Sequence, residues 1–315
     1  MKKAINLIWQ APRFERDWII KLLNNFQINE IIDEAHKVVM NNAIIVTQGL
    51  AIEGIEFCKY IKKFRAKNFK VGCIHLSDEW RSYPVDFYKE VDFVFRNYYR
   101  DEVQKLKNCH FFALGYKSGF SDSLVPKKIS DRKYFLSFVG QLKGTRYKMF
   151  EKAKEVNGNN FFCCTNAWDD PNGLNTSEYA EVLNDSIFVL CPRGNFSLDT
   201  FRFYEALEAG AIPIVEDRNS DVIFREFLKK QLFKKWKNKS IREYCYRVYQ
   251  ERKYWVKIYG TNFPCPKIYD WGRLKTLISQ IDIQYTNNKT QNWWIKYKQS
   301  LKDRMTMIIK NTFFQ

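Results

Sequence analysis

The chain has 315 residues, of which 45% are hydrophobic and 17% aromatic, and its formal net charge is +17. This length is about that of two ordinary domains, and the composition excludes a disordered chain. No apolar run approaches the ~18 residues that a membrane span needs. The eight cysteines lack the paired CxxC spacing of zinc sites. We therefore expect a cytoplasmic protein, membrane-peripheral if it meets a membrane at all, with free thiols and no metal.

The first 129 residues alternate short apolar runs with helix-like stretches. Such runs are typical of buried strands, and helical stretches between them predict parallel crossovers. The predicted strands are 4–9, 42–47, 70–76, 91–96 and 110–114, and the predicted helices are 16–26 and 52–64. We therefore predict an N-terminal α/β domain over 1–129 with a parallel sheet between helices.

Three groups suited to acid–base chemistry lie at the end of the predicted strand 70–76 and just after it: His75, Asp78 and Glu79. Ligands bind beyond the carboxyl ends of the strands in sheets of this kind. Asp78 and Glu79 are therefore the first candidates for a catalytic base, and His75 is the third. The alternative is structural, because Ser77 can begin a helix with Asp78 in its first turn.

A second alternating region follows a polar, basic stretch at 121–132, which is typical of a linker. Its predicted strands are 135–139, 160–164, 187–190 and 212–215, and its predicted helices are 177–183, 201–209 and 274–281. We predict a second domain over 130–287. A long amphipathic helix is expected within 288–315.

The loop between the strand 187–190 and the helix 201–209 has the features of an anion site. It contains Arg193, Gly194 and Asn195, and it leads into a helix that Asp199 or Thr200 can cap. A glycine allows close approach, an arginine pairs with a phosphate, and a helix N-terminus favours negative charge. These residues therefore suit a phosphate group.

Glu205 lies about one turn into the same predicted helix, among residues that the helix would bury. A carboxylate at that place can accept two hydrogen bonds from a cis-diol, as on a ribose. The alternative is an ion pair with Arg202 on a solvated helix face, because residues three apart are neighbours on a helix. Spacing alone does not decide between the two.

The motif Cys191-Pro-Arg-Gly194, followed by 200–207 and 209–215, resembles the donor-site signature of exostosin-like glycosyltransferases. The ending Ile-Pro-Ile-Val-Glu216-Asp217 is similar to the ribitol xylosyltransferase branch. This resemblance implies a GT-B fold, in which two Rossmann-like domains face a cleft. It also implies that the N-terminal domain binds the acceptor, that the C-terminal domain holds a nucleotide-sugar and that the last helix crosses back to the N-terminal domain.

The resemblance also implies roles for single residues. Glu205 would contact the ribose, and Arg193 with its loop would contact the diphosphate or the sugar. The first strand of the nucleotide domain ends in Phe-x-Gly in this family, as at Gly140, before an arginine that matches Arg146. The predicted donor-binding residues are Gly140, Arg146, Arg193, Gly194, Asn195, Thr200, Phe201, Arg202 and Glu205.

We therefore expect a glycosyltransferase that moves a sugar from a nucleotide-sugar to a glycan or a polyol phosphate. The donor implied by the resemblance is UDP-linked, with UDP-xylose as the first choice, and the transfer is inverting. We expect no metal and no other cofactor, because the sequence has no Asp-x-Asp motif and the arginines face the leaving diphosphate. The alternatives are a GDP-fucose-type fucosyltransferase and a non-catalytic polyanion- or nucleic-acid-binding protein on a similar fold.

Basic residues cluster densely between 224 and 257. Such a patch suits an anionic membrane, an anionic polymer or a nucleotide-sugar, and it is also compatible with a solvated helix face. No zinc finger, RNP signature or other nucleic-acid-reading motif accompanies it, so nucleic acid is not favoured as a partner.

Overall fold

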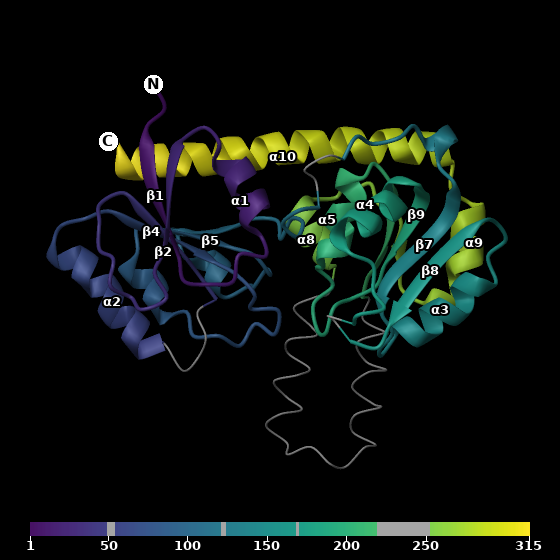
Figure 1. The fold of residues 1–315 in the computed structure, drawn as a ribbon, viewed down its shortest axis with the longest axis horizontal. Coiled ribbons are helices and arrows are strands. Elements are labelled where there is room, and N and C mark those ends of the chain that lie inside the picture. Colours follow the sequence, from purple (N-terminus) through teal and green to yellow (C-terminus); the bar gives the residue numbers. More distant parts are fainter. Residues whose placement is uncertain (49–53, 121–123, 168–169, 219–252) are drawn as a thin grey trace, which may run out of the picture. The chain divides into compact units, whose positions relative to one another are not determined.

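A computed structural model describes residues 1–48, 54–120, 124–167, 170–218 and 253–315. These residues form two compact units, each built on its own parallel sheet (Figure 1). Unit 1 consists of residues 1–118 and 296–315, and unit 2 consists of residues 119–295. Most of the predicted basic cluster, up to residue 252, lies outside the described residues.

The sheet of unit 1 has six parallel strands in the order β2-β1-β3-β4-β5-β6. They are β1 (Ala4–Trp9), β2 (Gln27–Ile32), β3 (Ala43–Thr47), β4 (Val71–His75), β5 (Phe93–Arg96) and β6 (Cys109–Phe111). Every residue of β3 and β4 is buried, because helices cover parallel strands on both faces. The five predicted strands are confirmed. The sequence analysis missed β2, a half-exposed edge strand of mixed polarity.

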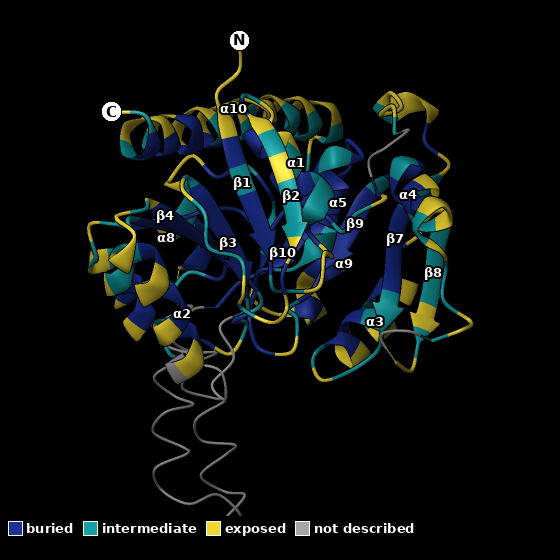
Figure 2. Cartoon of the chain, turned by 60° about the vertical axis from the view of Figure 1, so that its left-hand side comes forward, coloured by how far each residue is buried: buried dark blue, intermediate teal, exposed yellow. Residues whose placement is uncertain are grey.

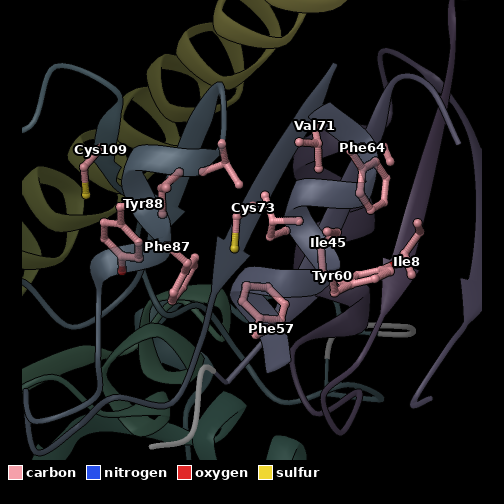
Figure 3. Close-up of a cluster of buried hydrophobic side chains, with 14 of the residues drawn as sticks. Ile8, Ile45, Phe57, Tyr60, Phe64, Val71, Cys73, Phe87, Tyr88 and Cys109 are labelled. Atoms are coloured by element: carbon pink, nitrogen blue, oxygen red, sulfur yellow. The ribbon is translucent and has the colours of Figure 1, made fainter. Parts of the chain in front are cut away.

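Two helices, α1 (Arg16–Leu23) and α2 (Gly54–Ala66), follow β1 and β3. Phe57, Tyr60 and Phe64 of α2 pack against Ile45 and Cys73 of the sheet (Figure 3). The chain moves from β1 to β2 in one direction along the sheet and from β3 to β4 in the other. Right-handed crossovers in opposite directions put α1 and α2 on opposite faces.

Unit 2 has a five-stranded sheet in the order β11-β10-β9-β7-β8. Its strands are β7 (Tyr134–Gln141), β8 (Asn160–Thr165), β9 (Ser186–Cys191), β10 (Ile212–Glu216) and β11 (Lys267–Ile268). Its helices include α3 (Arg146–Lys154), α4 (Thr176–Asn184), α5 (Phe201–Glu208), α8 (Tyr254–Tyr259) and α9 (Leu274–Ser279). Side chains of α3 and α9 pack on one face of the sheet. Figure 2 shows its central strands β9 and β10 largely buried, together with the middle of β7.

The last helix, α10 (Ile283–Phe313), is continuous over 31 residues and belongs to both units. In unit 2, the Trp294 indole donates to Glu208 Oε1 at 3.0 Å. In unit 1, Arg304 Nη2 donates to the Phe111 carbonyl at 2.7 Å. The predicted fold class, two parallel-sheet α/β units with a final helix that returns to the N-terminal one, is confirmed.

The described part of the predicted linker is anchored on unit 2. Arg132 donates hydrogen bonds to the carbonyls of Leu183, Ser186, Lys127 and Ala209. Burial lowers the pKa of its guanidinium to about 10, although Asp185 opposes this. This arginine is therefore a structural residue, and the chain enters unit 2 before it.

Candidate active site

The strand order of unit 2 reverses between the neighbouring strands β7 and β9. Open α/β sheets bind ligands at such a switch point, beyond the carboxyl ends of the strands. The predicted donor-binding residues Gly140 and Arg146 lie at the end of β7 and the start of α3. Arg193, Gly194 and Asn195 directly follow β9. The fold therefore brings the two predicted halves of the donor site to one edge.

Arg146 is buried and links the two loops at this edge. Its Nε and Nη2 donate to the Arg193 carbonyl at 3.1 and 2.7 Å, and its Nη1 donates to the Gln141 carbonyl at 2.9 Å. The planar fork of a guanidinium suits such paired acceptors. Arg146 therefore holds the backbone of the loop after β9, and its predicted contact with a diphosphate stays a prediction.

Glu216, at the end of β10, contacts the loop after β9, although the sequence analysis quoted it without assigning it a role. Its Oε2 accepts hydrogen bonds from the Arg193 backbone N–H at 3.2 Å, Thr145 Oγ1 at 3.1 Å and the Trp271 indole at 3.2 Å. Its Oε1 lies 3.8 Å from Arg193 Nε. The sequence could have indicated this role, because Glu216 is a carboxylate at the carboxyl end of a buried strand.

The rest of the loop after β9 is also held by hydrogen bonds. The Gly194 N–H donates to the Ser197 carbonyl at 2.8 Å, which closes a turn. Asn195 Oδ1 accepts a hydrogen bond from Lys143 Nζ, a cation that the sequence analysis did not select. Lys143, Arg146 and Arg193 therefore bring three positive charges to one edge, beside the single carboxylate of Glu216.

Gly140 lies against the Arg202 side chain beneath this edge. Its φ is +135°, and a Cβ at this position would lie 2.4 Å from Arg202 Nη2. Arg202 donates from Nε and Nη2 to the Val139 carbonyl at 3.1 and 2.7 Å, and its guanidinium lies over the Phe138 ring. The missing side chain at Gly140 therefore makes room for Arg202, and the predicted part of Gly140 in donor binding stays a prediction.

Glu205 does not lie on a solvated helix face, because the residue is only 4% exposed. Its Oε2 accepts a hydrogen bond from the Tyr179 hydroxyl of α4 at 2.9 Å. Burial and the neighbouring Glu205 raise the pKa of Tyr179 well above its ordinary value, so this phenol stays a proton donor. The alternative of an exposed Arg202–Glu205 pair is therefore wrong.

Thr200 and Phe201 lie at the start of α5. Thr200 occupies the N-cap with an extended backbone, but its side chain makes no capping hydrogen bond. Its Oγ1 is buried and has no hydrogen-bond partner within the described residues. Phe201 begins the helix and is half-buried.

In unit 1, the predicted base candidate His75 ends β4 and is fully enclosed. Its Nε2 lies 2.8 Å from the Gln48 carbonyl and its Nδ1 lies 2.6 Å from the Tyr88 hydroxyl. Nε2 therefore carries the proton, and Nδ1 accepts. Burial and the nearby Arg96 lower the pKa of His75 well below its ordinary value. The imidazole is neutral, and both nitrogens are engaged.

Asp78 and Glu79 follow in a loop where Ser77 adopts a φ of +64°. Asp78 Oδ2 lies 2.6 Å from Arg96 Nη2, and both side chains are buried. Its Oδ1 accepts the backbone N–H of Ser82 at 2.8 Å. A buried pair of this kind is costly to break. Glu79 is half-buried, and its backbone N–H donates to the Ser77 carbonyl at 2.8 Å.

Within the described ranges, no group of three or more His, Cys, Asp or Glu side chains could hold a metal ion. None of the helices that the structure describes combines the length and the apolar content needed to cross a membrane.

The family model of the RXYLT1 C-terminal domain matches residues 120–314. The chain belongs to this family. The resemblance to exostosin-like glycosyltransferases and their ribitol xylosyltransferase branch is thereby confirmed, and the protein is a glycosyltransferase of GT-B fold. The matched region contains all of unit 2 except its first residue, and with it every predicted donor-binding residue.

Two solved glycosyltransferases are similar to the chain over nearly its whole length. An α1,3-fucosyltransferase is 11% identical, with 96% of this chain and 91% of that one covered at a TM-score of 0.42. A UDP-glucosyltransferase from Polygonum tinctorium is 7% identical, with 98% and 99% covered at a TM-score of 0.42. A comparison with curated proteins found no match to this sequence.

Proposed function

We propose that this protein transfers xylose from UDP-xylose to a hydroxyl of a polyol phosphate or glycan, by one direct and inverting displacement. The ribitol xylosyltransferase after which the family is named supports this choice of sugar and acceptor. The observation that carries the proposal is the fixed backbone of Arg193. Arg146 binds its carbonyl, Glu216 accepts its N–H, and the loop lies at the β7–β9 switch point.

The donor diphosphate binds in this proposal at the loop after β9. Lys143 and the Arg193 side chain supply positive charge, and the start of α5 supplies a helix N-terminus. These groups stabilise the negative charge that grows on the diphosphate as the sugar leaves. Because the loop is already held in place, little reorganisation opposes the transition state.

The ribose of the donor binds Glu205 in this proposal. Tyr179 already donates to one oxygen of the carboxylate, which fixes its orientation. The remaining acceptor capacity of a carboxylate is enough for two ribose hydroxyls. The leaving diphosphate needs no metal in this scheme, because the protein supplies the countercharge.

An inverting transfer also needs a base for the acceptor hydroxyl. Of the predicted trio, His75 has both nitrogens engaged and Asp78 is paired with Arg96. Glu79 therefore stays as the candidate from that trio.

The test is a donor panel of UDP-xylose, UDP-glucose and GDP-fucose, each incubated with ribitol 5-phosphate and analysed by mass spectrometry. We expect a pentosyl adduct from UDP-xylose only. Transfer from GDP-fucose instead would overturn the donor assignment. Salt-sensitive binding of polyanions, without binding of any nucleotide, would favour the non-catalytic alternative.

A further inference from the structure

The carboxylate of Glu205 is held by a side chain from a neighbouring helix. The helices α4 and α5 lie side by side in unit 2 (Figure 1). Glu205 of α5 is 4% exposed, and its Oε2 accepts the Tyr179 hydroxyl of α4 at 2.9 Å. Hydrogen bonds to a carboxylate are stronger than those between neutral groups, and they matter most where water is excluded. The Tyr179 hydroxyl therefore stabilises one position of this carboxylate.

The first turn of α4 is itself fixed, which sets the place of Tyr179. Asn175 is the N-cap, and its Oδ1 accepts the Glu178 backbone N–H at 3.0 Å. The Glu178 carboxylate in turn accepts the Asn175 backbone N–H at 2.9 Å, which completes a capping box. Tyr179 follows directly, and its backbone N–H donates to the Asn175 carbonyl at 2.9 Å. The phenol is therefore carried by backbone of defined geometry.

The ring of Tyr179 has a second support in Phe120, which is the second residue of unit 2. The two ring centroids lie 5.7 Å apart at an interplanar angle of 58°. Aromatic pairs at this separation and inclination attract each other. Phe120 is only 2% exposed, so its own ring is enclosed. The Tyr179 side chain is therefore held through its ring as well as through its hydroxyl.

The Tyr179 hydroxyl keeps its proton at ordinary pH. Burial and then the neighbouring Glu205 raise the pKa of Tyr179 well above its ordinary value, although Arg202 opposes this. The phenol is therefore a permanent donor to Glu205. A carboxylate has about four lone-pair sites, so it accepts this bond and hydroxyls of a ligand at the same time. The direction in which it meets those hydroxyls is set by Tyr179.

A carboxylate fixed in this way favours a ligand with the complete set of hydroxyls. A nucleotide without the 2′-hydroxyl would displace water from Glu205 and return one hydrogen bond fewer. Sites that bind a substrate hydroxyl reject the analogue that lacks it, because their buried polar groups are left unpaired. The rejection weakens when the polar group is displaced from its productive position. The rigidity of Glu205 therefore controls how strongly ribose is preferred to 2′-deoxyribose.

We propose that Tyr179 and Phe120 are positioning residues that act through Glu205 and make the donor site of unit 2 selective for ribonucleotides over 2′-deoxyribonucleotides. This inference rests on the proposed function, in which Glu205 binds the ribose. It adds the class of nucleotide that the site rejects and the residues that enforce the rejection. Sugars linked to thymidine diphosphate, which carries 2′-deoxyribose, are then excluded as donors.

The role of Tyr179 is tested by the ratio of two affinities, those for UDP and for 2′-deoxy-UDP, measured by calorimetry. We expect the parent to bind UDP about 100-fold more tightly than 2′-deoxy-UDP. In Tyr179→Phe the ratio should fall below about 10, because UDP binding weakens and 2′-deoxy-UDP binding changes little. A purely structural role of the tyrosine would weaken both nucleotides alike and leave the ratio unchanged.

Phe120→Leu tests the second support, because leucine stays apolar but cannot make the ring contact. It should lower the ratio in the same direction as Tyr179→Phe and by a smaller factor. Two matched controls lie in unit 1. Tyr60→Phe removes a buried hydroxyl that donates to the Val38 carbonyl, and Phe26→Leu removes a ring stacked on Phe314. Both controls should lower the thermal midpoint and leave the ratio at its parent value.

A double variant tests whether Tyr179 acts through Glu205. Glu205→Ala alone should abolish the preference for UDP over 2′-deoxy-UDP, and adding Tyr179→Phe should then change neither affinity further. Independent, additive losses of UDP affinity in the double variant would overturn the positioning role.

The inference and the proposed function fail in different ways. A parent protein that binds neither nucleotide contradicts the proposed function. A parent that binds UDP and 2′-deoxy-UDP equally well contradicts the inference alone. A parent that prefers UDP, with the same preference in Tyr179→Phe, leaves the donor site standing and shows that Tyr179 does not position Glu205. A lower thermal midpoint in Tyr179→Phe without a change of ratio, as in the controls, has the same meaning.

Discussion

The guanidinium of Arg146 donates two hydrogen bonds to the backbone carbonyl of Arg193, at 3.1 and 2.7 Å. Glu216 accepts the backbone N–H of the same residue at 3.2 Å. Arg193 is thus held through both of its backbone polar groups, by residues from the end of β10 and the start of α3. This relationship fixes the loop in which we place the donor diphosphate.

Replacement of Arg146 by lysine should weaken UDP binding nearly as much as replacement by alanine. Lysine keeps the positive charge but lacks the planar fork that serves the Arg193 and Gln141 carbonyls together. We expect a 10- to 100-fold loss of affinity and about 1–3 kcal/mol of lost stability in both variants. Calorimetry and urea denaturation measure these quantities.

The control for Arg146 is Lys152→Met, because Lys152 pairs with Glu155 on an exposed helix face. Its removal should change neither quantity measurably. If Arg146→Lys binds UDP like the parent, Arg146 acts by its charge alone, and the loop-holding role is incorrect.

Gly140→Ala should destabilise the protein more than Gly144→Ala. At Gly140 the φ of +135° is unfavourable for alanine, and the new Cβ would lie 2.4 Å from Arg202 Nη2, so the end of the Arg202 side chain would have to move. We expect a loss of about 2–3 kcal/mol, mainly from the strained backbone. Gly144 also has a positive φ, of +54°, but no atom lies within 4 Å of the place that its Cβ would take. Its substitution should cost about 1 kcal/mol. Equal losses by urea denaturation would contradict the role of Gly140.

Glu15→Gln should stabilise the protein at pH 8 and leave its stability almost unchanged at pH 4.5. Burial raises the pKa of Glu15 from 4.5 to about 7, so the folded state holds a proton that the unfolded state has released. Stability in the parent therefore falls as pH rises between these values, by about 3 kcal/mol in total. The glutamine variant lacks this loss. Urea denaturation of both proteins at the two pH values gives the difference, and a difference independent of pH would refute the assignment.

The sequence predicts most of the fold because buried parallel strands are continuous apolar runs, as β3 and β4 are. The strand β2 was missed because Gln27, Asn29 and Glu30 interrupt its apolar pattern at the sheet edge. The helix α10 begins at Ile283, earlier than the predicted 288. Asp282 marks this start in the sequence, because an aspartate commonly caps a helix N-terminus. Its Oδ1 accepts the Tyr285 N–H at 2.9 Å.

The candidate site was predictable only where a local motif carries it. The loop Arg193–Asn195 and Glu205 lie within one short motif. The resemblance of that motif to a known donor-site signature was enough to select them as candidates. The role of Glu216 depends on bonds to residues 23 and 71 positions away in the chain. Gln10 and Asn97, which follow β1 and β5, belong to no motif. Their side-chain amides are buried without a hydrogen-bond partner among the residues that the structure describes, and only the folded chain shows this.

The central claim is a nucleotide site at the carboxyl edge of unit 2, and calorimetric titration with UDP and then GDP tests it most directly. The proteins are the parent, Glu205→Ala and the control Glu181→Ala, which alters an exposed residue of α4. We predict micromolar binding of UDP by the parent and the control, and a loss of at least tenfold in Glu205→Ala. Parent-like UDP binding by folded Glu205→Ala, or no UDP binding by the parent, would contradict the account.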